Sequence, residues 1–324
     1  SMLDPTSATL YLGHREAAVP FAKKSDMLPT LFGRTSHPIL VSMAMLLAGL
    51  TIWGATVAAI EPRHDRPWRP EIAVMPDVTV TDEGIGIDAI RDWTYRSDGP
   101  VTFDYRPGIY REDELVGMWF MVEPFGGSDA IAHTLVLFEF TGDRLLALTI
   151  EARKEEGELY SALKGAFNTF ELVYLWAEAR DVLTRRARYL QHEVFVYPLR
   201  LSKETQLAFL RSVIAKTEQL ETEPRFYNTL FSNCTNELAK SAGLSWNTAF
   251  ILTGYAANHL WREDVIPGRQ EGTPFDSVRQ QADMARTIDA LPDEAPDVFN
   301  RALLGELRAR FSGLIEPSPI EAAL

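Results

Sequence analysis

The sequence predicts an α+β fold in which helices pack on an antiparallel sheet, preceded by one transmembrane helix. Three features of the sequence indicate this class. Residues 39–60 form an apolar run without a charge, and residues 114–152 hold branched and aromatic segments joined by a tight turn at Gly142-Asp143. Ser202 caps a segment whose apolar residues recur at helical spacing through residue 217.

The apolar run of residues 39–60 is long enough to cross a bilayer, since about 20 apolar residues suffice. A signal peptide has a shorter apolar core and an earlier start. We therefore expect an N-terminal cytoplasmic segment of residues 1–38, a transmembrane helix of residues 39–60, a proline-rich spacer of residues 61–78 and an extracytoplasmic catalytic domain of residues 79–324. Basic residues flank the run on both sides, so charge alone does not choose the orientation.

Composition narrows the range of partners. The 324 residues include 32 Lys and Arg against 45 Asp and Glu, a net charge of −13, with no basic stripe that would bind nucleic acid. The single cysteine, Cys234, excludes an internal disulfide framework. The sequence indicates no metal and no cofactor, and it leaves the oligomeric state open.

The expected elements of the domain follow in chain order. Strands are expected at residues 78–80, 91–95, 114–122, 130–140, 144–152, 167–176 and 194–197. Helices are expected at residues 202–217, 235–242, 282–291 and 295–314, with loops at 155–165 and 264–280. Residues 181–191 are predicted as a helix or as a basic edge.

Cys234 precedes the expected helix of residues 235–242. The first N–H groups of a helix and its dipole stabilise a thiolate, as in nucleophilic cysteines. A buried, inert thiol is the alternative, but the polar neighbours Ser232, Asn233, Thr235 and Asn236 favour a helix cap.

A thiol nucleophile needs a base and an orienting group. Among six histidines, His133 opens a central strand, and the hairpin of residues 130–152 brings it near Glu151. A core histidine is the competing interpretation of His133, and Glu158 or Asn236 could replace Glu151 as the orienting group. The order His, acid, Cys is reversed relative to papain and suits a circularly permuted papain-like fold.

Several stretches of the sequence resemble, in order, the Lnb-type lipoprotein N-acylation proteins. These stretches are Ile90-Arg91-Asp92-Trp93-x-Tyr95, Ala130-Ile131-Ala132-His133-Thr134, Ile150-Glu151-Ala152-Arg153-Lys154-Glu155-Glu156-Gly157-Glu158, Phe170-Glu171-Leu172-Val173-Tyr174, Tyr197-Pro198-Leu199 and Tyr227-Asn228-x-x-x-x-Asn233-Cys234-Thr235. The resemblance covers residues 85–260. It implies an enzyme anchored in the inner membrane, with its catalytic domain in the periplasm. It also implies diacylated lipoproteins and membrane lipid as partners, and transfer of an acyl chain from the glyceryl group to the α-amine of the lipoprotein's N-terminal cysteine.

The residue types are compatible with that chemistry. Cys234 would form a thioester, and His133 would move the proton. The oxyanion donors would be the Cys234 N–H and an Asn233 or Asn228 side chain. Arg153 and Lys154 could meet lipid headgroups, and Glu158 and Tyr174 complete the set of candidate site residues. The expected acyl groove is lined by Trp119, Phe120, Met121, Trp246 and Phe250.

Two other functions fit the same sequence. The first is a membrane-anchored cysteine amidase or endopeptidase that acts on cell-wall peptides through the same Cys and His. The second is a lipid- or lipoprotein-binding module in which Cys234 is structural. An apolar cleft favours the transferase, and a polar open groove favours the wall hydrolase.

Overall fold

The computed structural model describes residues 38–95, 101–245, 247–292 and 294–315, so the expected N-terminal cytoplasmic segment lies almost wholly outside the described residues. The chain divides into two units, residues 1–52 and 53–324. The described side chains of helix α1 (Pro38–Ala58) are solvent-exposed except Trp53, which is half-buried. Its stretch Pro38–Thr56 is long and apolar enough to cross a membrane, in agreement with the sequence.

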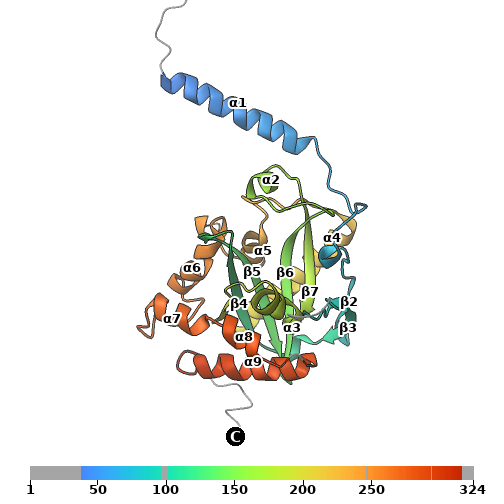
Figure 1. The fold of residues 1–324 in the computed structure, drawn as a ribbon, viewed down its shortest axis with the longest axis vertical. Coiled ribbons are helices and arrows are strands. Elements are labelled where there is room, and N and C mark those ends of the chain that lie inside the picture. The colour runs from blue at the N-terminus through green and yellow to red at the C-terminus, as the bar shows by residue number, and fades with distance from the viewer. Residues whose placement is uncertain (1–37, 96–100, 246, 293, 316–324) are drawn as a thin grey trace, which may run out of the picture. The chain divides into compact units, whose positions relative to one another are not determined.

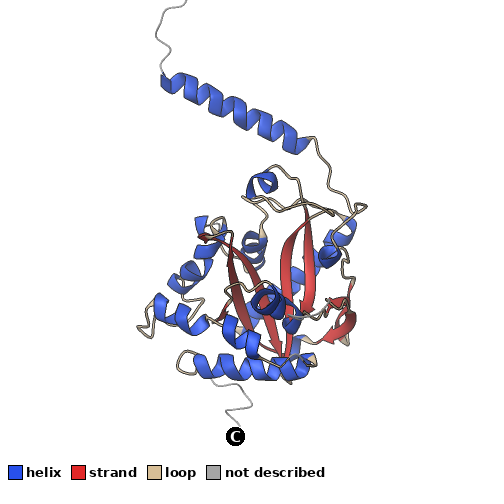
Figure 2. Ribbon diagram, viewed as in Figure 1, coloured by secondary structure: helices blue, strands red, loops and turns tan. Residues whose placement is uncertain are grey.

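The described residues of the second unit form an eight-stranded sheet of order β1-β2-β7-β6-β5-β4-β8, with β3 paired to β2 (Figures 1 and 2). The strands are β1 (Val78–Thr81), β2 (Gly84–Arg91), β3 (Tyr105–Tyr110), β4 (Leu115–Phe125), β5 (Ser128–Phe140), β6 (Arg144–Arg153), β7 (Glu171–Glu178) and β8 (Phe195–Pro198). All pairings are antiparallel except that between β2 and β7, which is parallel at Arg91 and Ala177. The predicted α+β class is confirmed.

Helices cover both faces of this sheet (Figure 2). Residues of β5 alternate between the faces: Thr134 bonds to α5 and Phe138 packs on Phe209 of α4, whereas Glu139 pairs with Arg308 of α9. The helices are α2 (Ala162–Ala166), α3 (Ala179–Thr184), α4 (Lys203–Thr222), α5 (Cys234–Ser241), α6 (Ala256–Arg262), α7 (Phe275–Ala282), α8 (Ala285–Ala290) and α9 (Pro296–Arg310).

The sheet opens at one end. The pairing of β5 with β6 runs from Phe140 and Arg144 to Leu135 and Thr149 and then stops. Beyond that point β5 stays with β4, and β6 stays with β7. In Figure 1 the two strand pairs diverge toward the end of the domain where α2 lies. Continuation of the ladder by two residues would pair His133 with Glu151, so both residues stand at the start of this opening.

Four of the expected elements differ from the structure, and one strand was missed. The strand expected at 91–95 ends at Arg91, because the backbone N–H of Trp93 binds the buried carboxylate of Asp181 instead of a neighbouring strand. Strand β3 was not predicted. The loop expected at 264–280 contains the start of α7, and the loop expected at 155–165 contains the start of α2. The strand expected at 167–176 begins at Glu171.

Candidate active site

Cys234 is the first residue of α5, and Asn233 is the cap of that helix. The Asn233 side chain accepts a hydrogen bond from the N–H of Asn236. Its amide nitrogen donates to the carbonyls of Thr229 and Phe250, each at 2.8 Å. Both amide protons are therefore used to hold the start of the helix, and the side chain offers no free donor to a substrate.

This arrangement predicts a stability effect. We expect Asn233→Ala to lower the free energy of unfolding by about 2 kcal/mol, because the helix loses its cap and two carbonyls lose their donor. Thermal or urea unfolding of the full chain in detergent measures the loss. Asn247→Ala is the matched control, since Asn247 caps only the three-residue turn Thr248–Phe250. An equal effect of both substitutions would contradict the role given to Asn233.

The thiol of Cys234 meets the imidazole of His133 at the opening of the sheet. Burial raises the pKa of the thiol, but the hydrogen bond to His133, the charge of His133 and hydrogen bonds from Thr134 outweigh it, so the pKa falls below its usual value. Thr134 reaches the sulfur where β5 has left β6, and its hydroxyl also bonds to Thr235 at 2.8 Å. The free edge of β5 thus supplies a donor to the nucleophile.

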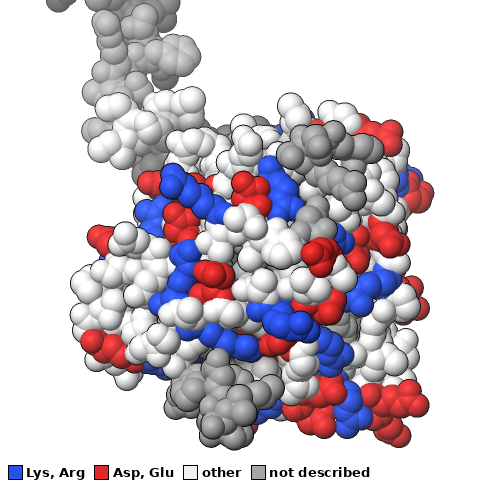
Figure 3. Space-filling view, turned by 60° about the horizontal axis from the view of Figure 1, so that its bottom comes forward, with Lys and Arg blue, Asp and Glu red and all other residues white. Residues whose placement is uncertain are grey.

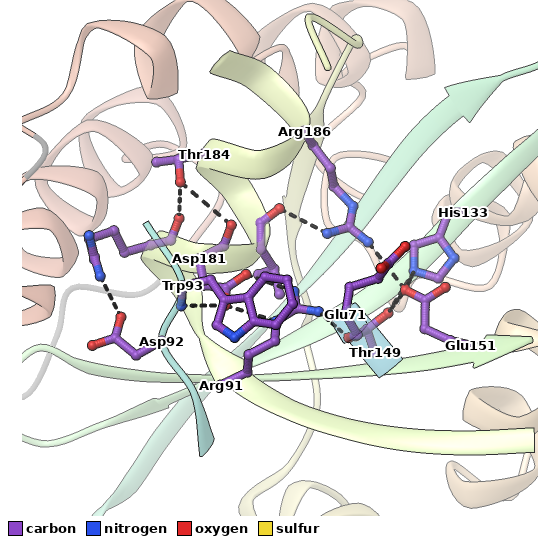
Figure 4. A network of polar contacts seen from close by, with 12 residues as sticks. Glu71, Arg91, Asp92, Trp93, His133, Thr149, Glu151, Asp181, Thr184 and Arg186 are labelled. Carbon is purple, nitrogen blue, oxygen red and sulfur yellow. Dashed lines mark hydrogen bonds and ion pairs between the residues drawn. The ribbon is translucent and has the colours of Figure 1, made fainter. Parts of the chain in front are cut away.

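Glu151 and Thr149 hold the imidazole from the β6 side. Nε2 of His133 lies 2.7 Å from Oγ1 of Thr149 and 3.3 Å from Oε1 of Glu151, and the Thr149 hydroxyl donates to Glu151 at 2.9 Å (Figure 4). Because the hydroxyl proton goes to Glu151, Thr149 accepts from Nε2–H. Nδ1 is then the ring nitrogen available to take a proton from the thiol.

Arg186 fixes the carboxylate of Glu151. It is 2% exposed, and its guanidinium lies 2.6 Å from Glu123 and 3.5 Å from Glu151. In Figure 4, Arg186 and His133 point toward Glu151 from different elements. Burial raises the pKa of Glu151, but the charges of His133 and Arg186 outweigh burial, so the pKa falls to about 2. Glu151 is therefore a carboxylate, which keeps the pKa of His133 above its ordinary value against burial.

Comparison with known proteins identifies the family of this domain. A family model described as the Lnb N-terminal periplasmic domain matches residues 104–263, a range that includes His133, Glu151 and Cys234. The chain belongs to the Lnb family. No curated protein and no solved structure matches it. With α1, the match makes the chain a membrane-associated Lnb-family protein with a periplasmic domain.

In this Lnb-family protein the side chains of the other candidate residues are hydrogen-bonded to groups other than the thiol. The Asn228 side chain holds its own loop through Asn168, Leu230 and Phe231. Glu158 accepts from the N–H of Glu155, and Tyr174 donates to Glu237 at 2.9 Å in the interior. Asn236 donates to the carbonyl of Leu230.

The two basic candidates of the Lnb-family domain, Arg153 and Lys154, bind backbone groups of residues 69–73. Arg153 is buried against the carbonyls of Ile72 and Ala73, and its guanidinium lies 4.5 Å from the Trp68 ring. Burial lowers the pKa of Arg153 to about 10. The carbonyl of Lys154 accepts the N–H of Arg69 at 3.0 Å, and the charge of Lys154 contributes to the low pKa of Glu151.

Sequence reasoning missed five residues of the Lnb-family site: Thr134, Thr149, Arg186, Glu123 and Tyr227. Thr149 could have been found, since it lies two positions from Glu151 on the same strand face. Tyr227 is buried, and burial together with the nearby Cys234 and Tyr160 raises its pKa well above the usual value, so its hydroxyl keeps its proton. A protonated hydroxyl near the sulfur is a hydrogen-bond donor for an oxyanion.

An apolar cavity lies behind the nucleophile helix of the Lnb-family domain. Its volume is about 110 Å³, and Thr235, the neighbour of Cys234, forms part of its wall. Of the predicted groove residues, Phe120 and Phe250 line it. Trp119 turns to the opposite face and donates to Glu139, Met121 does not line the cavity, and Trp246 lies outside the described residues.

The contacts that link Cys234, His133 and Glu151 predict how alkylation of the thiol depends on pH. Glu151→Gln removes the charge that raises the pKa of His133, so the imidazolium that stabilises the thiolate is lost at a lower pH. We expect the pH midpoint of Cys234 alkylation by iodoacetamide to rise by about one unit. Glu158→Gln is the control, because its carboxylate faces a turn. An unshifted midpoint in Glu151→Gln would contradict the assignment.

Proposed function

We propose that this protein is a thiol acyltransferase anchored in the inner membrane by a single span, with its catalytic domain in the periplasm. Its substrates are diacylated lipoproteins, and it moves an acyl chain from the diacylglyceryl group to the α-amine of the lipoprotein's N-terminal cysteine. The observation that carries the proposal is the contact of Cys234, at a helix start, with a His133 imidazole that Glu151 and Thr149 orient. Such an arrangement activates a thiol nucleophile.

The first half-reaction forms a thioester. The Cys234 thiolate attacks the ester carbonyl, and the bond between that carbonyl carbon and the glyceryl oxygen breaks. His133, protonated at both ring nitrogens, donates its Nδ1 proton to the departing glyceryl oxygen. The Cys234 N–H and the Tyr227 hydroxyl are the donors we assign to the oxyanion. The Asn233 and Asn228 amides already donate to Thr229, Phe250 and Asn168.

The second half-reaction transfers the acyl group to nitrogen. The free α-amine of the same lipoprotein attacks the thioester carbonyl and loses a proton to His133, and the Cys234 thiolate leaves. The products are an amide at the lipoprotein N-terminus and a free glyceryl hydroxyl, which is the lyso form. Water must be kept from the thioester during this step, and the apolar cavity beside α5 supports that requirement.

Mass spectrometry of a lipoprotein N-terminus tests the proposal. Cells that express the wild-type protein should yield N-acylated lyso-form peptides, and cells that express Cys234→Ala should yield only diacylglyceryl peptides with a free amine. Identical lipoprotein N-termini in the two strains would reject the transferase function. Release of peptides from cell-wall material by wild type and not by Cys234→Ala would support the wall amidase instead.

A further inference from the structure

Exposed apolar side chains gather at the end of the domain where the sheet opens. Leu159 and Leu163 in the β6–β7 connection are 78% and 71% exposed, and Phe231 in the loop before Cys234 is 54% exposed. Phe167 at the end of α2 is 37% exposed. Such exposure of large apolar side chains in neighbouring segments marks an interaction surface.

The two segments form one surface because they are hydrogen-bonded to each other. The N–H of Thr229 donates to the carbonyl of Gly165, and its hydroxyl donates to the carbonyl of Ala162 at 2.8 Å. The ring of Tyr160 packs edge-on against Tyr227. In Figure 1, α2 lies beyond the strand ends on the side of the domain that holds α5. The apolar surface therefore includes the loop that leads into Cys234.

The opposite end of the domain has a different surface. Figure 3 shows the face around that end, where Lys, Arg, Asp and Glu side chains of both signs are interspersed. Such a mixture is typical of a face that stays in water. The end that carries α2 differs in its exposed apolar side chains, which are Leu159, Leu163, Phe167 and Phe231.

A short stretch of chain joins helix α1 to the end of the domain that carries the apolar surface. Residues 59–62 separate α1 from Arg63, whose N–H donates to Glu171, the first residue of β7. At most about 3.6 Å per residue, five steps of chain reach about 18 Å. Pro67 and Arg69 are also bound to the start of the β6–β7 connection, at Glu156 and Lys154. The length of residues 59–62 therefore limits the distance between Ala58, the last residue of α1, and the start of β7 to about 18 Å plus the hydrogen bond.

We propose that Leu159, Leu163, Phe167 and Phe231 form a membrane-docking surface that inserts into the boundary between lipid headgroups and acyl chains. Exposed Lys164, in the same helical turn, is positioned to meet anionic headgroups while its stem lies along the apolar surface. Docking would let an acyl chain pass from the bilayer to Cys234 without crossing water. That purpose rests on the proposed function, whereas the docking itself needs no catalysis.

Lipid quenching of single-site labels tests this surface. The full chain carrying Cys234→Ala would receive one new cysteine at Leu163→Cys and, separately, at Leu159→Cys. A polarity-sensitive fluorophore would label each variant in vesicles of phosphatidylethanolamine and phosphatidylglycerol that contain nitroxide-labelled lipid. The matched control is Arg301→Cys on α9, a position with a 69% exposed side chain.

We expect nitroxide lipid to quench the labels at positions 163 and 159 at least about twofold more than the label at position 301, since docked side chains lie about 5–10 Å inside the boundary. Equal quenching at all three positions, whether strong or weak, would overturn the proposal. Neither result depends on acyl transfer, so failure of the docking surface and failure of the enzymatic function are separate findings.

Discussion

Replacement of His133 with alanine is expected to lower the rate of acyl transfer to a lipoprotein amine by about 10³-fold or more. Three effects combine in this variant. The thiol loses its hydrogen-bonded partner, so its pKa rises toward the value that burial favours. The glyceryl oxygen loses its proton donor, and the attacking amine loses its proton acceptor. Single-turnover transfer in proteoliposomes measures the rate.

A second histidine provides the control for His133→Ala. His259 lies on α6 against the ring of Phe250, and His259→Ala removes a similar volume without touching the thiol. We expect its transfer rate to stay within about twofold of wild type, as for substitutions outside the reacting groups. A transfer rate of His133→Ala equal to that of His259→Ala would exclude His133 as the base.

Replacement of Arg186 with methionine is expected to cost about 3–5 kcal/mol of folding free energy, because it leaves the carboxylates of Glu123 and Glu151 without their buried partner. Arg186→Lys keeps the charge and loses the forked geometry, so we expect an intermediate loss. Urea unfolding in detergent gives the free energies. The control is Arg211→Met, which breaks an exposed pair with Glu112 and should cost less than about 1 kcal/mol.

The substitution Arg186→Met should also change how the stability of the protein depends on acid pH. The pKa of Glu151 is about 2 in the folded chain against an ordinary 4.5, so its contribution to stability is complete above pH 4.5 and is lost as pH falls toward 2. Without Arg186 the folded-state pKa rises, and less stability remains to be lost in that pH range. A wild-type and an Arg186→Met protein with parallel stability curves between pH 5 and pH 3 would contradict this role.

The local features of the site could be predicted from the sequence. A strand face has a period of two, and the turn at Gly142-Asp143 sets the register, so the hairpin had to bring His133 near Glu151. Asn233 before a helix pattern indicated a cap, which placed Cys234 at the helix start. These contacts join residues that are close in sequence or that face each other in one hairpin, so the local pattern of residues is enough to predict them.

The long-range parts of the site could not be predicted in this way. Arg186 meets Glu123 across 63 positions of sequence, and the contact depends on which face of the sheet α3 covers. The amides of Asn228 and Asn233 are polar groups near a nucleophile, yet their N–H groups donate to Asn168, Thr229 and Phe250 and are not free for a substrate. The helix α7 was missed because its apolar pattern is short, and Val278 is buried only through packing on distant elements.

Intact-protein mass spectrometry of the reaction between the full chain and a diacylated lipoprotein tests the central claim most directly. The claim is that the Cys234 sulfur carries the acyl group between the glyceryl oxygen and the amine. We predict a mass increase of one acyl chain that maps to Cys234, disappears with hydroxylamine and decays as N-acylated lipoprotein forms. Continued production of N-acylated lipoprotein by a chain that carries Cys234→Ala would contradict the claim.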